Sequence, residues 1–380
     1  MKKILLLACS CLMAICMKAV ETTDYITVTA ATLNPGGAEV KLTFSLVGST
    51  NYYSGYNMDI HFPEGMEVCY NKSNKPNVTM KKPSLYPYSE EEDEETEEMV
   101  KTYTHTISSS YGVVGDRVLR VACISTENDV FTNVGGDLFT VTVKASPFAK
   151  PGKASIKIDG VALKVAGGDE YDPVERTDEN VTISTAATAP VTISSNKWST
   201  CILPFDAELP TGVTAYSTSA KTTIDDADYL VLSKVNALEG YKPYILYSET
   251  AYSGSLEGTV DATKYPTEGY VTDGYLNGAI TVQQITEGFV LQNLTEGMKF
   301  YATGGQTFSI PAGKCWVTLP SAEAKAFGFA LEDETGVKPI RDLKQYENEV
   351  YDLSGKKIDI RQTRVNHIYI INGQKVLKTK

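Results

Sequence analysis

Histidine and recognisable catalytic motifs are scarce in this chain. Only His61, His105 and His367 occur among 380 residues. There is no His-Glu-x-x-His pair for zinc, no Gly-x-Ser-x-Gly nucleophile segment and no glycine-rich phosphate loop. Asp59 and His61 would share one side of a strand, and a solvent-facing strand explains this spacing better than a catalytic pair. We predict a protein that is not an enzyme and has no cofactor and no metal site; paired acids of a glycan-active hydrolase remain the alternative.

Long apolar runs are absent beyond the first twenty residues, so the sequence predicts no transmembrane span. The apolar run 4–17 follows two lysines and ends near the small Ala19, which is typical of a signal peptide over residues 1–19. Cys9 in "LLAC" fits a lipid-attachment pattern, but the apolar stretch before it is short. We expect an exported protein, extracellular or on the outer surface, with a lipid anchor at Cys9 as the less favoured alternative.

Cysteine is sparse after the signal, where only Cys69, Cys123, Cys201 and Cys315 remain. Their wide spacing matches neither a compact disulfide framework nor a zinc pattern. Cys201 and Cys315 each lie in an apolar segment close to a tryptophan. We predict that these two segments are neighbouring strands, which makes Cys201 and Cys315 the candidate disulfide in an oxidising exterior.

Basic residues are outnumbered, with 35 Lys and Arg against 47 Asp and Glu and a net charge of −12. Such a chain repels phosphate backbones, so we expect no nucleic-acid partner. The acids concentrate in "SEEEDEETEE" (89–98), which predicts a solvated loop because like charges cannot pack in a core. A cation site over 90–98 is the alternative, although a run of glutamates lacks the spaced oxygens of a calcium loop.

Helical periodicity is also nearly absent, and the best helix candidate, 320–333, is short. Period-two alternation of apolar and polar residues recurs instead, with Gly, Pro, Asn and Asp between the runs. The expected inward-facing residues are Leu42, Phe44, Leu46, Met58, Ile60, Phe62, Phe139, Val141, Val143, Ile156 and Ile158. The pattern predicts an all-β protein with two antiparallel β-sandwich-like domains followed by a small C-terminal β-hairpin unit.

Two linkers set the predicted domain boundaries. "TISTAATAPVTIS" is small and polar, and "LEDETGVKPI" is charged and rich in turn residues. They separate a first domain (24–185), a second domain (188–330) and a tail (341–380). The tail contains Ser354-Gly355 and Asn372-Gly373 between apolar runs, which predicts two hairpins because these residues accept positive φ.

Three segments resemble known families. The first domain resembles cohesin-like modules, in the broad family that includes carbohydrate-binding β-sandwiches. The resemblance rests on "AEVKLTFSLVGSTNYYSGYNMDIHFPEGMEV", "DRVLRVACISTENDVFTNVGGDLFTVTVKA" and "PGKASIKIDGVALKV". "NKWSTCILPFDAELPTGVTAYS", "YKPYILYS" and "GGQTFSIPAGKCWVTLP" resemble an accessory module of secreted Bacteroidota proteins. "DETGVKPI", "VYDLSGKKI" and "IYIINGQKVLK" resemble the sorting tails of type IX secretion, which implies export machinery as a partner of the tail.

These features together favour a non-enzymatic binding or adhesion protein of the bacterial surface, whose ligand is a surface protein or a polysaccharide. Tyr52, Tyr53 and Tyr56 in "NYYSGYN" are the candidate ligand-binding residues, since sugar rings stack on exposed aromatic side chains. Core packing of these tyrosines is the competing interpretation. A structural subunit of a surface assembly is a further alternative, and self-association in solution would favour it.

Overall fold

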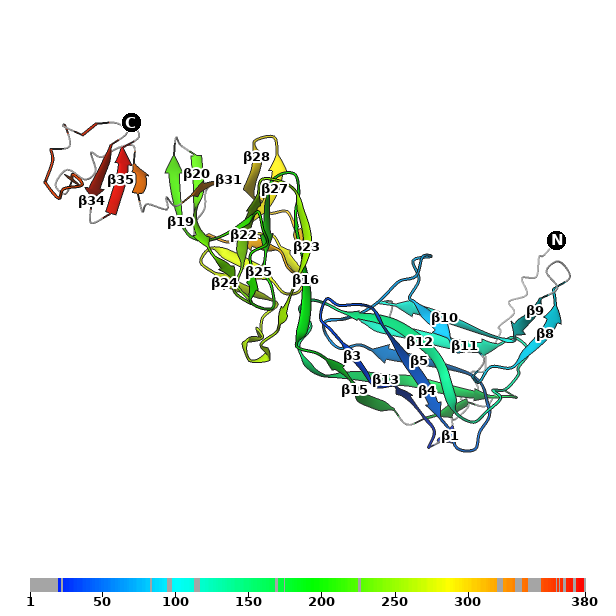
Figure 1. Cartoon of the computed structure of the whole chain (residues 1–380). Helices are drawn as coiled ribbons and strands as arrows, with labels where there is room; N and C mark the ends of the chain where they lie inside the picture. The colour runs from blue at the N-terminus through cyan, green and yellow to red at the C-terminus, as the bar shows by residue number, and fades with distance from the viewer. Residues whose placement is uncertain are drawn as a thin grey trace, which may run out of the picture. The chain divides into compact units, whose positions relative to one another are not determined.

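The computed structural model describes residues 20–21, 23–82, 84–93, 98–112, 117–167, 170–173, 175–224, 227–319, 324–331, 337–340, 350–359, 361, 363–364, 367–371 and 374–378. These residues form β-strands and one short 3-10 helix, η1 (Ala262–Lys264), with no α-helix among them. No helix in this part of the chain is long and apolar enough to cross a membrane. The predicted all-β fold class is therefore confirmed (Figure 1). The chain divides into unit 1 (Met1–Ser184) and unit 2 (Thr185–Lys380), and the predicted signal peptide lies outside the described residues.

Unit 1 is built from two sheets. The first follows the order β1-β14-β13-β5-β11-β10, and β15 joins β13 to β3. Its strands are β1 (Val20–Glu21), β3 (Ala31–Leu33), β5 (Tyr53–His61), β10 (His105–Tyr111), β11 (Val118–Ser125), β13 (Gly152–Val165), β14 (Glu170–Asp172) and β15 (Arg176–Ile183). The second sheet has the order β2-β4-β12-β6, with β7 also on β12, and comprises β2 (Tyr25–Val28), β4 (Val40–Val47), β6 (Met66–Val68), β7 (Val78–Met80) and β12 (Gly136–Ala145).

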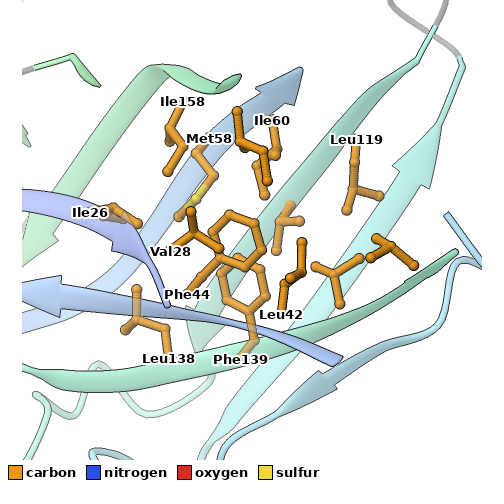
Figure 2. Close-up of a cluster of buried hydrophobic side chains, with 14 of the residues drawn as sticks. Ile26, Val28, Leu42, Phe44, Met58, Ile60, Leu119, Leu138, Phe139 and Ile158 are labelled. Carbon is orange, nitrogen blue, oxygen red and sulfur yellow. The ribbon is translucent and has the colours of Figure 1, made fainter. Parts of the chain in front are cut away.

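One continuous apolar core lies between these two sheets (Figure 2). Leu42, Phe44 and Leu46 of β4 are buried, as the alternation predicts. The other predicted inward-facing residues are buried as well: Met58, Ile60, Phe62, Phe139, Val141, Val143, Ile156 and Ile158. Because one side of each strand faces this core, the intervening residues are left on the outer face of the sheet.

Two local predictions are wrong. The first part of the acidic run is a strand and not a loop: β8 (Tyr88–Glu92) and β9 (Met99–Tyr103) pair as an antiparallel two-stranded ribbon, while residues 94–97 lie outside the described part. The pairs Tyr88–Tyr103 and Glu90–Lys101 join residues from both sides of the run, so cross-strand contacts offset its charge repulsion. The helix candidate at 320–333 contains β31 (Ala326–Leu331), a strand that pairs with its neighbours on both sides.

The largest sheet of unit 2 has ten strands in the order β17-β22-β19-β20-β31-β28-β27-β30-β25-β24. Besides β31, its strands are β17 (Trp198–Cys201), β19 (Val213–Ile224), β20 (Ala227–Val235), β22 (Tyr244–Ser248), β24 (Tyr270–Asp273), β25 (Leu276–Ala279), β27 (Phe289–Leu294), β28 (Gly297–Ala302) and β30 (Cys315–Val317). Unit 2 also contains three separate two-stranded sheets: β16 (Ala186–Ile193) with β23 (Tyr252–Thr259), β18 (Ala207–Glu208) with β21 (Ala237–Leu238), and β26 (Gln283–Ile285) with β29 (Phe308–Ile310).

The C-terminal segment forms a separate four-stranded sheet of order β32-β35-β34-β33. Its strands are β32 (Val337–Ile340), β33 (Val350–Tyr351), β34 (Ile368–Ile371) and β35 (Gln374–Lys378). Val350, Tyr369, Ile371 and Val376 give it a small core of its own. Gly355 has φ +83° in the first predicted turn, and β34 pairs with β35 across the second, whose residues 372–373 lie outside the described part.

Candidate binding face

The outer face of β5, β11 and β13 is the candidate site, and it is called the strand face below. Three adjacent strands in register supply it, since β5 pairs with both β11 and β13. Residues that alternate with the buried ones point outward from each strand. They are Asn57, Asp59 and His61 from β5, Arg120, Ala122 and Ile124 from β11, and Lys153, Lys157, Asp159 and Lys164 from β13.

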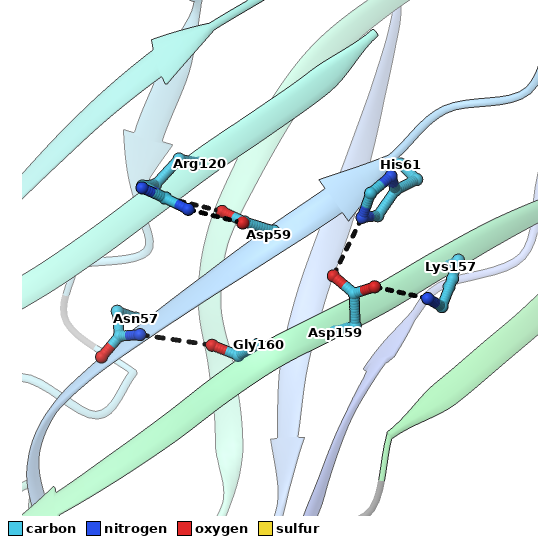
Figure 3. Close-up of polar contacts among 7 residues, drawn as sticks. All are labelled: Asn57, Asp59, His61, Arg120, Lys157, Asp159 and Gly160. Atoms are coloured by element: carbon cyan, nitrogen blue, oxygen red, sulfur yellow. Dashed lines mark hydrogen bonds and ion pairs between the residues drawn. The ribbon is translucent and has the colours of Figure 1, made fainter. Parts of the chain in front are cut away.

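Two carboxylates at the centre of the strand face are held by cations (Figure 3). Arg120 donates to Asp59 through Nε at 2.8 Å and Nη2 at 2.7 Å. Asp159 accepts from Lys157 Nζ at 2.5 Å and contacts His61 Nε2 at 2.9 Å. Asp59 lies opposite both Arg120 and Asp159 in the strand register, so the pairs form one row across the three strands.

The basic side chains are more exposed to solvent than the carboxylates with which they pair. The side chains of Arg120 and Lys157 are 53% and 52% exposed, whereas those of Asp59 and Asp159 are 16% and 20% exposed. Lys153 and Lys164 are exposed on the same side of β13. The three strands therefore present four basic groups outermost above two recessed acids, although the whole chain is strongly acidic.

The hydrogen bonds of this row fix its charge state at neutral pH. Burial raises the pKa of Asp159, but hydrogen bonds from Lys157 and His61 outweigh it, and the pKa ends below its usual value. The hydrogen bond to Asp59 raises the pKa of Arg120, and the bond to Asp159 does the same for Lys157. Asp159 is thus ionised, and Arg120 and Lys157 stay charged.

An extra residue in β13 shapes the strand face next to this row. Asp159 lies opposite Asp59, but the next paired residue, Ala162, lies opposite Asn57, so the register shifts at a β-bulge. Gly160 has φ +55° in this bulge, and Asn57 Nδ2 donates to its carbonyl at 3.2 Å.

The other end of the strand face carries an exposed aliphatic side chain beside small residues and Lys164. Ile124 is 59% exposed and lies opposite Gly55, and Ala122 lies opposite Asn57. Small neighbours leave the Ile124 side chain raised above the sheet. This combination of an exposed aliphatic residue beside ionic groups is suited to a partner with a broad surface of its own.

The tyrosine prediction is corrected by the structure. Tyr52 is 50% exposed, but Tyr53 and Tyr56 are 0% and 2% exposed, so the three form no stacking platform. Tyr53 donates to Asp24 at 2.7 Å, and the hydroxyls of Tyr56 and Tyr86 lie 2.9 Å apart. These partners satisfy the buried hydroxyls, which lets both rings pack in the core.

The candidate disulfide is not formed, since Cys201 and Cys315 are both free and buried. Their strands nevertheless lie against each other: the Cys315 Sγ–H donates to the carbonyl of Cys201 at 3.2 Å, and the Cys315 N–H donates to Thr200 Oγ1 at 2.9 Å. Burial raises the pKa of the Cys201 thiol to about 12 and raises that of Cys315 as well. The predicted proximity is correct, and both sulfurs are thiols.

Two concave sites lie outside the strand face. A cavity of about 30 Å³ beside Phe205, Tyr241 and Asp261 has room for water. An open depression of about 400 Å³ lies in the C-terminal sheet beside Leu353, Arg364 and Tyr369. Among the residues that the structure describes, no group of three His, Cys, Asp or Glu could hold a metal ion.

Sequence alone identified Asp59 and His61 as neighbours on one strand but missed their partners. Arg120, Lys157 and Asp159 come from strands 59 to 100 positions away, and the register that aligns them is not visible in the sequence. The alternation in "VLRVACIS" and "ASIKIDG" could have placed these three residues on outer faces, without pairing them.

No family model and no curated protein matches this chain. Among solved structures, a cohesin module of a Clostridium perfringens family 33 glycoside hydrolase covers 43% of this chain and 97% of its own, with 11% identity and TM-score 0.31. A non-cellulosomal cohesin from Archaeoglobus fulgidus covers 43% and 91%, with 14% identity and TM-score 0.26. A type II cohesin module of an Acetivibrio cellulolyticus scaffoldin covers 41% and 96%, with 15% identity and TM-score 0.27. At these identities and TM-scores the likeness assigns no function to this chain.

Proposed function

We propose that this chain is a non-enzymatic binding protein of the bacterial exterior and that a protein partner docks on the strand face. The single observation that carries the proposal is the arrangement of that face: exposed basic groups above recessed carboxylates, beside an exposed isoleucine on the outer side of a sheet. A small molecule needs a concave site that buries most of its surface. An open, partly apolar sheet face with ionic groups instead fits a macromolecule.

A protein is favoured over a polysaccharide because the strand face offers no exposed aromatic ring for a sugar to stack on. Its outward residues are Asn, Asp, His, Arg, Ala, Ile and Lys. Ile124 would enter an apolar part of the partner, and Arg120 and Lys157 would form ion pairs around it. Charged groups at the rim mainly set association rate and specificity, while a central apolar contact supplies much of the affinity.

The test is affinity capture with the full chain as bait, from surface extracts of the source bacterium, followed by measured affinities for the captured protein. Ile124→Asp is expected to weaken binding at least about tenfold, as for a buried apolar anchor. The matched control is Val47→Asp, which changes an exposed aliphatic residue of the opposite sheet and should leave binding unchanged. Equal effects of the two substitutions would contradict the proposal, as would turnover of a polysaccharide that one carboxylate substitution abolishes.

The C-terminal segment is proposed to deliver or retain the protein at the surface, after export directed by residues 1–19. Its support is the separate four-stranded sheet with its own small core, together with the resemblance to sorting tails. Because β32 already belongs to this sheet, the deletion should begin at Val337. The truncated protein is expected to keep partner binding and to lose its surface location. Unchanged location and amount would leave the segment with a purely structural role.

A further inference from the structure

The β8–β9 ribbon is the most unusual surface of unit 1. It pairs with no other strand, and Figure 1 shows it extending from the end of the two sheets. Its residues are exposed along almost its whole length, including the large apolar Tyr88, Met99 and Val100. Two-stranded ribbons without a packed face are marginal in water, so an exposed apolar ribbon of this kind gains stability when a partner covers it.

The ribbon is also the most acidic described part of unit 1. Glu90, Glu91, Glu92, Asp93 and Glu98 belong to it, and its Lys101 is already engaged by Glu90 at 3.1 Å and by the ring of Tyr88 at 4.2 Å. Glu91 and Glu92 lie directly opposite Val100 and Met99 in the register. Consecutive residues of a strand point to opposite sides, so Glu91 shares one side of the ribbon with Val100 and Glu92 shares the other side with Met99. Each side therefore carries a carboxylate beside an exposed apolar side chain.

The strand face is complementary to this ribbon in both respects. It presents Arg120, Lys153, Lys157 and Lys164 outermost, where the ribbon presents glutamates. It also presents the exposed Ile124, where the ribbon presents Met99 and Val100. We propose that the β8–β9 ribbon of a second copy of this chain docks on the strand face. This inference rests on the proposed function, because it names the partner of the same face.

The expected association is weak because the contact is small. With strands about 4.8 Å apart and about 3.4 Å per residue, the two five-residue strands of the ribbon offer about 160 Å². Two such surfaces bury less than the roughly 1,200 Å² of standard stable complexes, which places the contact among transient ones. The two docking surfaces are different, so each copy can both give and receive a ribbon, and association can continue beyond a dimer.

The experiment measures the mass of the full chain by sedimentation at concentrations up to several hundred micromolar. In about 0.1 M salt the Debye length is about 10 Å, which screens distant repulsion between acidic chains but not charges in contact. We expect reversible association there, with a dissociation constant at least about tenfold higher in 1 M salt, where the Debye length is about 3 Å. A chain that stays monomeric throughout this range overturns the inference.

Charge-reversal variants identify the surfaces. Glu91→Lys with Glu92→Lys replaces two acids of the ribbon by bases, one on each side, and Lys153→Glu with Lys164→Glu makes the face acidic while leaving the ion pairs of Asp59 and Asp159 in place. Each double variant alone should be monomeric, because like charges then meet. An equimolar mixture of the two should associate again. Association that persists in either variant alone, or a mixture that stays monomeric, contradicts the proposed contact.

The matched control is Lys41→Glu with Lys75→Glu, which changes the net charge equally but alters β4 and the β6–β7 connection. This variant should associate as the original chain does, and circular dichroism should show all variants folded. The outcome is separable from that for the proposed function. If the chain never self-associates while Ile124→Asp abolishes capture of a foreign protein, the face binds a partner but not a second copy. If neither binding is found, both proposals fail.

Discussion

Phe139 joins the two sheets of unit 1 by aromatic stacking. Its ring stacks on Phe44 of the neighbouring strand at 5.0 Å and 9°, and on Tyr56 of the opposite sheet at 5.8 Å and 23°. All three rings are almost completely buried. Tyr56 lies on β5 beside Asn57, so this stack supports the strand face from inside.

Replacing Phe139 by Ala removes both stacks and leaves a cavity. Truncation of a buried Phe costs about 3–5 kcal/mol, a range that includes the aromatic contribution. With a urea m-value of about 2 kcal/mol/M for a domain of this size, the midpoint should fall by about 1.5–2.5 M. Phe139→Leu keeps most of the volume and should cost only about 1 kcal/mol.

Far-UV circular dichroism in urea follows the strands of both units, whereas tryptophan fluorescence follows unit 2 alone and serves as an internal control. A transition that shifts in circular dichroism but not in fluorescence belongs to unit 1. Both tryptophans of the chain, Trp198 and Trp316, lie in unit 2, so the fluorescence transition should keep its midpoint. If Phe139→Ala costs no more than Phe139→Leu, the packing argument is refuted. If Phe139→Ala is already unfolded without urea, the substitution costs more free energy than the whole stability of unit 1.

Three further predictions concern titratable groups. Burial lowers the pKa of His105, whose Nε2 has no hydrogen-bond partner. Because the unfolded state takes up a proton near pH 6.5 and the folded state only at lower pH, the free energy of unfolding should fall below pH 6.5 by up to about 1.4 kcal/mol per pH unit. Urea melts of His105→Phe at several pH values should lack this slope. The pKa of Asp159 is depressed in the folded state, so its ion pairs stabilise the fold above about pH 4, and this stabilisation is lost as the pH falls through the folded-state pKa. Asp159→Asn should therefore lower the free energy of unfolding by at most about 1 kcal/mol at pH 7 and by nothing near pH 2. An equal loss at both pH values would disprove the ionic origin. With its pKa near 12, the Cys201 thiol is ionised to only about 1 part in 10⁴ at pH 8. A thiol reagent should therefore label neither Cys201 nor Cys315 until urea unfolds the chain. If unfolding under non-reducing conditions exposes no thiol at these positions, the two cysteines form a disulfide and the prediction is wrong.

The buried face of each strand was predictable from sequence because it depends on local alternation. Leu42, Phe44 and Leu46 must all face the same side once β4 is extended, and the structure buries all three. The fold class follows from the same signal repeated along the chain. Strand pairing does not, since the order of the sheets depends on contacts between residues that are distant in sequence.

Errors in the sequence-based predictions arise where a distant partner reverses a local preference. Tyr53 and Tyr56 carry hydroxyls that favour the surface, but Asp24 and Tyr86 accept or share their protons in the core. The acidic run favours a loop, but pairing of Tyr88 with Tyr103 and of Glu90 with Lys101 holds residues 88–92 and 99–103 as a ribbon. The ionic row on the strand face was missed for the same reason, because three strands must align before Asp59 meets Arg120.

The bulge in β13 gives a last prediction that links backbone conformation to the strand face. Gly160 has φ +55°, a left-handed conformation that costs roughly 1–2 kcal/mol for most residues but less for Asn. A Cβ at this position would meet only Asp59 Oδ2, at 4.0 Å, so substitution tests conformation and not crowding. Urea melts should therefore rank stability as Gly160, then Gly160→Asn, then Gly160→Ala, with Gly160→Val lowest because β-branched residues tolerate positive φ poorly. The bulge also sets which residues of β13 stand opposite Asp59 and Asn57, so a variant that relaxes it would move Lys164 relative to Arg120 and weaken partner binding. If Ala and Asn are tolerated equally and Val costs no more, the left-handed conformation is not what requires glycine here.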